Sequence, residues 1–101
     1  MAISTQISAD GQELSIFIQG RFDFGAHQEF RDAYERVDGT PKRYLVDLQG
    51  TTYLDSSALG MLLLLRDHAG GDHAQIRLLN CSGDVRKILA ISNFEQLFQI
   101  A

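Results

Sequence analysis

Hydrophobic and polar residues alternate along the first part of the chain. Side chains at every second position are apolar or β-branched, from Ile3 to Ile7 and again from Leu14 to Ile18. Between these stretches stands Asp10-Gly11, a dipeptide that is typical of tight turns. The pattern therefore predicts two antiparallel strands joined by a hairpin.

A different spacing follows Asp23, where apolar residues recur at steps of roughly three and four. This period is typical of a helix with one face toward a core, and Asp23 can cap its first turn. The positions that we assign to this helix are Phe24, Ala26, Phe30, Ala33, Tyr34 and Val37. The helix should end before Gly39-Thr40-Pro41, which predicts a loop.

The rest of the chain alternates short apolar runs with helical patterns. Residues 43–48, 75–80 and 97–100 have the composition of strands, whereas residues 56–69 and 82–91 have the spacing of helices. The whole order is then β-β-α-β-α-β-α-β. It implies an α/β fold with a mainly parallel mixed sheet, right-handed crossovers and helices packed against the sheet.

The size of the chain limits it to one hydrophobic core. Its 101 residues are 45% hydrophobic, which suffices for one core and leaves too few residues for a second. We therefore predict a single domain over residues 1–101. The net charge is −4 and the nine Lys and Arg residues are scattered from Arg21 to Lys87. This distribution argues against a nucleic acid and favours a protein as partner.

Cysteine usage and hydropathy indicate a cytoplasmic protein. The single cysteine, Cys81, cannot form an internal disulfide, and we expect it as a small hydrophobe in the core or at its edge. Residues 1–6 lack the basic and long apolar regions of a secretory signal. The longest apolar run, from Met61 to Leu65, is far shorter than the roughly 20 residues of a membrane-spanning helix. No membrane insertion is expected.

The start of the second helix carries the candidate chemistry. Asp55 is suited to accept hydrogen bonds from the first free backbone N–H groups, and Ser56 and Ser57 follow in the first turn. The helix N-terminus favours a phosphate on either hydroxyl, although the Asp55 carboxylate opposes it. Simple capping is the alternative interpretation, and the residues alone do not distinguish Ser56 from Ser57.

The second helix is apolar over about 200° of its circumference, at about 100° per residue, a broad face suited to a sheet. The residues on this face are Ala58, Leu59, Met61, Leu62, Leu63, Leu65 and Ala69. Leu64 falls outside it, on the side of Ser57, Gly60 and His68. An exposed Leu64 flanked by Met61 would form a small docking strip. The alternative is a Leu64 that is buried under the third helix.

Two motifs resemble those of the STAS-domain family, and within it the stand-alone anti-sigma factor antagonists of bacterial partner-switching systems. Residues 20–23, Gly-Arg-Phe-Asp, resemble a family signature of glycine, any residue, an apolar residue and aspartate. Residues 46–59, Val-Asp-Leu-Gln-Gly-Thr-Thr-Tyr-Leu-Asp-Ser-Ser-Ala-Leu, resemble its long central motif. The resemblance covers essentially the whole chain.

The resemblance implies a regulatory switch. It identifies Ser56 as the residue that a serine kinase phosphorylates and a serine phosphatase resets, with Asp55 as its acidic neighbour. Unphosphorylated members bind an anti-sigma factor or related regulator and release it when phosphorylated. The residues that we expect to bind this partner are Asp55, Ser57, Gly60, Met61, Leu64, His68 and Asp23. The free protein is expected to be a monomer.

Three features depart from the family pattern. Ala58 stands where many members have glycine, and Asn93-Phe94 stands where a Gly-Leu pair is frequent. Asn93 can still adopt the left-handed conformation that ends a helix. The chain stops at Ala101 without the extra terminal helix of some members, so one sheet face or edge is expected to be less covered.

No metal, cofactor or catalytic site is predicted. Asp67-His68 and Asp72-His73 fall on a helix end and a loop without further metal ligands, and solvated polar residues are the better explanation. Residues 39–42 lack the spacing of a phosphate-binding loop, and no serine lies in a Gly-x-Ser-x-Gly motif. The main alternative to a switch is a constitutive STAS subunit bound to a transporter ATPase. An enzyme, suggested only by the adjacent Asp55 and Ser56, is the third hypothesis.

Overall fold

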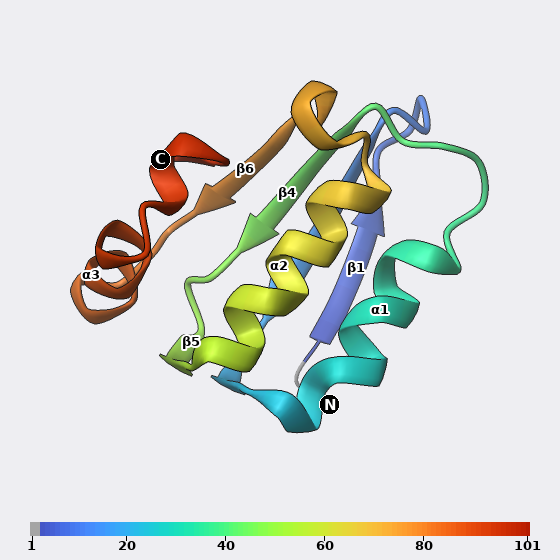
Figure 1. The fold of residues 1–101 in the computed structure, drawn as a ribbon. Helices are drawn as coiled ribbons and strands as arrows, with labels where there is room; N and C mark the ends of the chain where they lie inside the picture. Colours follow the sequence, from blue (N-terminus) through green and yellow to red (C-terminus); the bar gives the residue numbers. More distant parts are fainter. Residues whose placement is uncertain (1–2) are drawn as a thin grey trace.

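Short strands and helices alternate along residues 3–101, the part of the chain that the computed structural model describes (Figure 1). The strands are β1 (Ile3–Ile7), β2 (Glu13–Ile18), β3 (Gly20–Phe22), β4 (Arg43–Asp47), β5 (Thr51–Leu54), β6 (Ile76–Leu79) and β7 (Gln99–Ile100). The α-helices are α1 (His27–Glu35), α2 (Ser56–His68) and α3 (Gly83–Ile91). Short 3₁₀ helices are η1 (Phe24–Ala26), η2 (Gly71–His73) and η3 (Phe94–Gln96). This is the predicted order with two strands, β3 and β5, added.

The main sheet contains five strands in the order β1-β2-β4-β6-β7 (Figure 1). β1 pairs with β2 in antiparallel orientation, whereas β2, β4, β6 and β7 run parallel to one another. The parallel connections pass through helices, as such crossovers require. The prediction of an α/β fold with a mainly parallel mixed sheet is therefore confirmed.

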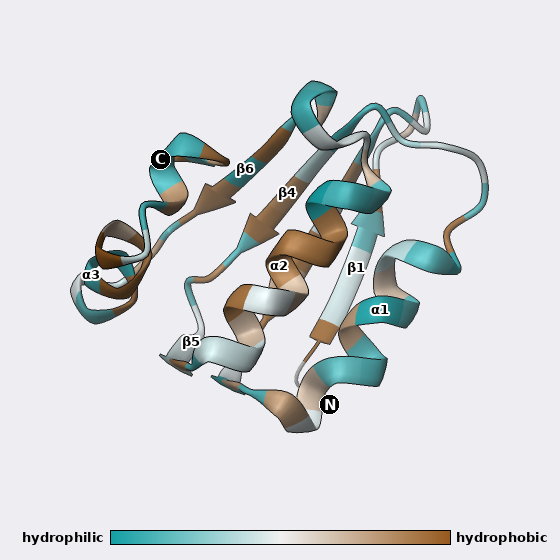
Figure 2. Ribbon diagram, in the orientation of Figure 1, coloured by the Kyte–Doolittle hydropathy of each residue, from teal (hydrophilic) through white to brown (hydrophobic). Residues whose placement is uncertain are grey.

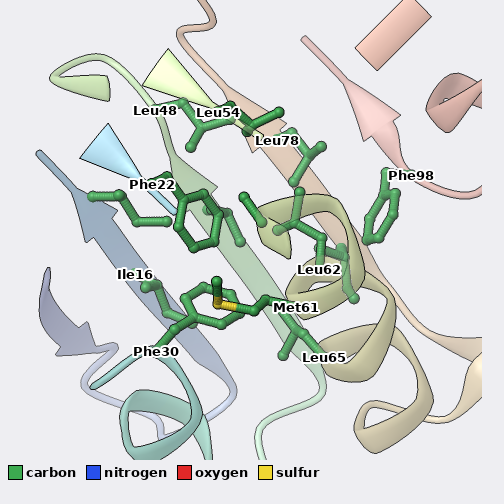
Figure 3. Close-up of a cluster of buried hydrophobic side chains, with 14 of the residues drawn as sticks. Ile16, Phe22, Phe30, Leu48, Leu54, Met61, Leu62, Leu65, Leu78 and Phe98 are labelled. Atoms are coloured by element: carbon green, nitrogen blue, oxygen red, sulfur yellow. The ribbon is translucent and has the colours of Figure 1, made fainter. Parts of the chain in front are cut away.

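Both α1 and α2 pack against one face of this sheet (Figure 1). The middle of α2 is hydrophobic, whereas its last turn and most of α1 are hydrophilic (Figure 2). The buried strand residues are Leu14, Ile16, Ile18, Tyr44, Val46, Ile76 and Leu78. Between strands and helices lie Phe22, Phe30, Leu48, Leu54, Met61, Leu62, Leu65 and Phe98 (Figure 3). Their removal from water is the main contribution to stability.

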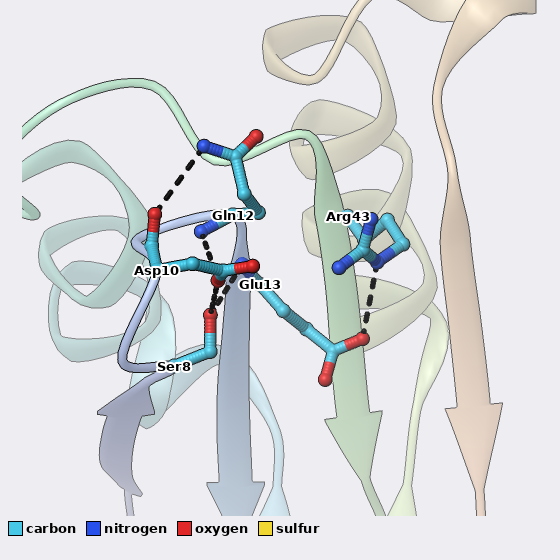
Figure 4. A network of polar contacts seen from close by, with 5 residues as sticks. All are labelled: Ser8, Asp10, Gln12, Glu13 and Arg43. Atoms are coloured by element: carbon cyan, nitrogen blue, oxygen red, sulfur yellow. Dashed lines mark hydrogen bonds and ion pairs between the residues drawn. The ribbon is translucent and has the colours of Figure 1, made fainter.

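The turn between β1 and β2 is held by side-chain hydrogen bonds (Figure 4). The Asp10 carboxylate accepts one from the Ser8 hydroxyl at 2.7 Å and one from the Gln12 backbone N–H at 3.0 Å. These hydrogen bonds hold the pKa of Asp10 below its usual range, because they stabilise the charged carboxylate. The hairpin predicted around Asp10-Gly11 is confirmed.

The first helix differs from the prediction at both ends. Phe24 to Ala26 form a 3₁₀ turn, and the α-helix begins only at His27 and ends at Glu35, before Val37. The tighter turn changes the phase of the side chains. Phe24, which the spacing places on the core face, is consequently 71% exposed.

The sequence pattern does not reveal β3 and β5, because β3 has only three residues and the four residues of β5, Thr-Thr-Tyr-Leu, show no alternation of apolar and polar side chains. They pair with each other in parallel and form a second, smaller sheet. The Thr51 hydroxyl donates a hydrogen bond to the Ile18 carbonyl at 2.9 Å. The start of β5 is thereby tied to the end of β2.

Two expectations about single residues are confirmed. Asn93 adopts the left-handed conformation, with φ of 59°, just after the end of α3. Cys81 is half-buried against the core, and burial raises the pKa of its thiol. In the helices that residues 3–101 form, none combines the length and hydropathy that crossing a membrane would need.

Candidate functional site

The candidate site surrounds the N-terminus of α2, where two chain segments run side by side. β3 and β5 pair in parallel, and the residue after each strand is an aspartate, Asp23 in one segment and Asp55 in the other. Asp23 Oδ1 accepts a hydrogen bond from the Gly25 N–H at 3.0 Å, and Asp55 Oδ1 accepts one from the Ala58 N–H at 2.9 Å. Both predicted caps are therefore confirmed, and two helical N-termini lie next to each other.

The two serines in the first turn of α2 differ in exposure. Ser56 is exposed, whereas Ser57 is half-buried. At about 100° per residue, Ser56 lies opposite the side of α2 that buries Leu62 and Leu65. A group attached to Ser56 would project into solvent without disturbing the core. The geometry thus distinguishes two hydroxyls that capping chemistry alone leaves equivalent.

A groove of about 420 Å³ runs beside these serines. The residues that line it are Phe24 and His27, from the segment after β3, and Ser57, Gly60, Met61 and Leu64, from α2. The Phe24 ring lies 5.9 Å from the His27 ring, centroid to centroid. Because Phe24 is 71% and Leu64 50% exposed, the groove presents two large apolar side chains to solvent. Exposed apolar patches of this kind are typical of protein-binding surfaces.

The predicted docking strip on α2 needs two corrections. Leu64 is on the surface as expected, and the alternative in which the third helix buries it is wrong. Met61, however, is only 3% exposed, so it belongs to the core and forms no exposed flank. Leu63 is 38% exposed although the spacing places it toward the sheet. The reason is that the face of α2 covered by the sheet and α1 is narrower than the apolar face of its sequence.

The other expected partner-binding residues are distributed around the groove. Ser57 and Gly60 line it, and Asp23 and Asp55 cap the two helical turns at its end. His68 is exposed at the far end of α2, with its ring 4.9 Å from that of Tyr34. His68 therefore lies outside the groove.

Sequence reasoning missed Phe24 and His27 as site residues. Both come from the segment after Asp23, and the helical spacing assigned Phe24 to the core. The glycine directly after Phe24 is a weak helix former. It is the one local signal that a regular helix does not yet run through this position.

Arg21 supplies a positive charge at the same edge. Its Nε lies 3.3 Å from Asp23 Oδ2, and its guanidinium lies over the Tyr53 ring, 4.2 Å from the centroid. The Arg21 side chain is 65% exposed, so this ion pair contributes little to stability. The site as a whole offers two capping carboxylates, an exposed hydroxyl and an apolar groove. Such a set suits protein binding and covalent modification of the hydroxyl.

Two of the four residues considered as metal ligands make other contacts. Asp72 Oδ1 lies 3.2 Å from Arg66 Nη2, and His68 packs against Tyr34. Within residues 3–101, no group of three or more His, Cys, Asp or Glu side chains is arranged to hold a metal ion.

This chain is similar to known proteins in its sequence and in its fold. Residues 5–99 match the family described as "Mlab, STAS domain". A STAS-domain containing protein of Pseudomonas aeruginosa is 78% identical over 101 residues, which is the full length of both chains.

Among solved structures, the unphosphorylated anti-sigma factor antagonist SpoIIAA superimposes with a TM-score of 0.76 at 19% identity, over 99% of this chain and 87% of SpoIIAA. The phosphorylated form of the Bacillus protein gives 0.75 at 20% identity, over 99% and 91%. A sulfate transporter family protein from Wolinella succinogenes gives 0.75 at 15% identity, over 93% and 80%. At these identities the likeness concerns the fold.

Proposed function

Because this chain belongs to the STAS-domain family, we propose that it is a phosphorylation-controlled protein-binding switch. The unphosphorylated form binds an anti-sigma factor or a related regulator. A serine kinase phosphorylates Ser56, which changes the partner, and a serine phosphatase resets the protein. The observation that carries this proposal is the exposed Ser56 hydroxyl in the first turn of α2, beside an apolar groove.

The position of Ser56 suits a phosphate. The free backbone N–H groups and the dipole of α2 both stabilise negative charge at this end of the helix. A phosphate adds about −1.5 to −2 charges, and the neighbouring Asp55 carboxylate makes this edge more negative still. The outward direction of Ser56 means that this charge can be added without rearranging the core.

The phosphate would act on the partner through the adjacent groove. A partner that covers Phe24 and Leu64 removes water from that surface and from whatever stands next to it. Burying a charged group without a counter-charge is costly, so phosphorylation disfavours a partner that fits the unmodified surface. A partner that offers arginine at this point would gain charge-assisted hydrogen bonds instead.

Phosphorylation is tested by incubating the purified protein with ATP and a lysate of the bacterium that carries it, followed by intact-mass analysis and peptide mapping. Wild type should gain one phosphate on Ser56. Ser56→Ala should gain none, and Ser57→Ala, the matched control, should be modified as wild type. If Ser56→Ala is modified to the same extent as wild type, or if wild type gains no phosphate, the proposed switch is wrong.

The effect on binding is tested by titrating the cognate anti-sigma factor with two variants. Ser56→Ala should bind as the unmodified protein does. Ser56→Asp should bind about tenfold more weakly or worse, since it places a charge against a desolvated surface. Equal affinity of the two variants would remove the electrostatic argument. In this proposal the protein acts in the cytoplasm, is a monomer when free and catalyses no reaction itself.

A second candidate function is a constitutive subunit of a transporter ATPase complex. It is supported by the fold shared with the sulfate transporter family protein of Wolinella succinogenes. Stable co-purification with an ATPase that Ser56→Asp leaves unchanged would favour this role over the switch. Loss of the complex in Ser56→Asp, with retention in Ser56→Ala, would favour the switch.

A further inference from the structure

The face of the main sheet that points away from α1 and α2 carries a second depression, of about 400 Å³. It lies where β4, β6 and β7 begin, at the opposite end of the sheet from Ser56. The lining side chains that matter here are Glu13 from β2, Arg43 and Leu45 from β4, Arg77 from β6 and Gln99 from β7. Figure 4 views the sheet from this side, with Glu13 and Arg43 in front of the strands and the helices behind.

The strand register brings two arginines together on this face. Leu45 is the partner of Arg77, and Arg43 precedes Leu45 by two positions on the same strand. Arg43 and Arg77 are therefore diagonal neighbours on adjacent strands, within reach of long side chains. Arg43 Nε lies 3.4 Å from Glu13 Oε2. Among the ion pairs and side-chain hydrogen bonds found within residues 3–101, none involves Arg77, which is exposed.

The depression consequently holds an uncompensated positive charge in a chain whose net charge is −4. Glu13 is the single carboxylate in its lining and faces two guanidinium groups. Asp10 also interacts with the charge of Arg43, but its carboxylate lies in the β1–β2 turn and accepts hydrogen bonds from Ser8 and Gln12. Most N–H groups of the two arginines thus remain free to bind a ligand.

The chemistry of the lining identifies the class of ligand. Arginine presents its N–H groups in a planar fork that matches the oxygens of a carboxylate or a phosphate. Gln99 pairs with Arg77 in the register of β6 and β7 and adds an amide, while the half-buried Leu45 supplies an apolar surface. The volume of about 400 Å³ is in the range of small-molecule sites, about 300–1,000 Å³. We propose that this depression binds a small organic anion, held by Arg77 and Arg43.

The test uses the isotope-labelled full chain, titrated with inorganic phosphate and, separately, with succinate, at an ionic strength kept constant with sodium chloride. Backbone and arginine N–H signals are followed by NMR. Saturable shifts should be confined to the starts of β4, β6 and β7. Arg77→Gln should bind about tenfold more weakly, because it loses the charge-assisted hydrogen bonds. Glu13→Gln should bind more tightly than wild type, because it releases Arg43.

The matched control is Arg31→Gln, which changes an exposed arginine on α1 that pairs with Glu35. It should bind as wild type does. Saturation by phosphate but not succinate would assign a phosphate ester, and the reverse would assign a carboxylate. The absence of saturation with both anions, or equal affinity of Arg77→Gln and Arg31→Gln, would overturn the proposal. Because no step of this test involves Ser56, its outcome is independent of the switch.

Discussion

The outer faces of α1 and α2 are built in different ways. On α1, oppositely charged side chains four residues apart neutralise one another. Arg31 Nε lies 2.7 Å from Glu35 Oε2, and Arg36 Nε lies 3.5 Å from Asp32 Oδ1. Such pairs give a modest stabilisation that needs no other protein. The hydrophilic colour of α1 in Figure 2 reflects this surface.

The outer face of α2 has no comparable charge pairs along its first turns. Its members there are small or apolar, namely Ser56, Gly60, Leu63 and Leu64. Apolar side chains on such a face make no favourable hydrogen bonds with water, and exposed apolar surface of this kind is typical of protein-binding sites. The charged side chains on the outer face of α1 are thus paired within the chain, whereas the outer face of α2 leaves apolar surface available for contact with a partner.

The largest expected change in the free energy of unfolding comes from the inner, buried face of α2, and a matched change on the outer face should have little effect. Leu62→Ala should lower the free energy of unfolding by about 2–5 kcal/mol, because Leu62 is fully buried and its truncation leaves a cavity. Leu64→Ala, its matched control on the outer face, should change the free energy by only about 0.5 kcal/mol. Urea unfolding of both variants measures the difference. Similar losses would show that α2 has no distinct outer face.

A smaller effect of opposite sign is expected at Gly60. A Cβ built there meets nothing within 4 Å, and the backbone is helical. Gly60→Ala should therefore raise the free energy of unfolding by about 0.5–1 kcal/mol, through higher helix propensity. Ala90→Gly, the reverse change at an exposed position of α3, should lower it by a similar amount. If urea unfolding shows Gly60→Ala to be destabilised, the fold itself requires this glycine.

The smallest effect concerns the ion pairs on α1. Arg31→Gln should lower the free energy of unfolding only slightly, and by less than Gly60→Ala raises it, at low ionic strength. Salt screens exposed charges, so the loss should shrink when the urea unfolding is repeated in concentrated sodium chloride. A loss that is independent of salt would assign the role of Arg31 to packing and not to charge.

The length of a repeating pattern decides how far the fold is predictable from this sequence. β2, β4 and the three α-helices each contain enough residues to show a period of two or of 3.6, and the short β6 is marked by its apolar run Ile-Arg-Leu-Leu. β3 and β5 have neither signal, and they exist because each pairs with the other. The 3₁₀ turn at Phe24 is equally hidden, because a local change of phase leaves the composition of the segment unchanged.

The candidate site is predictable to the extent that it depends on α2 alone. The cap by Asp55 follows from the residue type before the helix, and helical spacing places Leu64 outside the apolar face of α2, although it leaves open whether the third helix covers Leu64. Phe24 and His27 do not, because they enter the groove from another segment. The prediction that Met61 is exposed beside Leu64 is wrong for a related reason. Helical spacing gives the direction of a side chain, but it does not show how much of the helix surface the sheet and α1 cover.

The parallel pairing of β3 and β5 joins parts of the chain that are distant in sequence, since Asp23 and Asp55 are 32 positions apart. A newly synthesised chain contains every residue around Ser56 before it has this surface. A modifying enzyme that recognises the assembled surface would pass over chains that are still unfolded. In the proposed switch, phosphorylation of Ser56 would then occur only on chains that have completed folding.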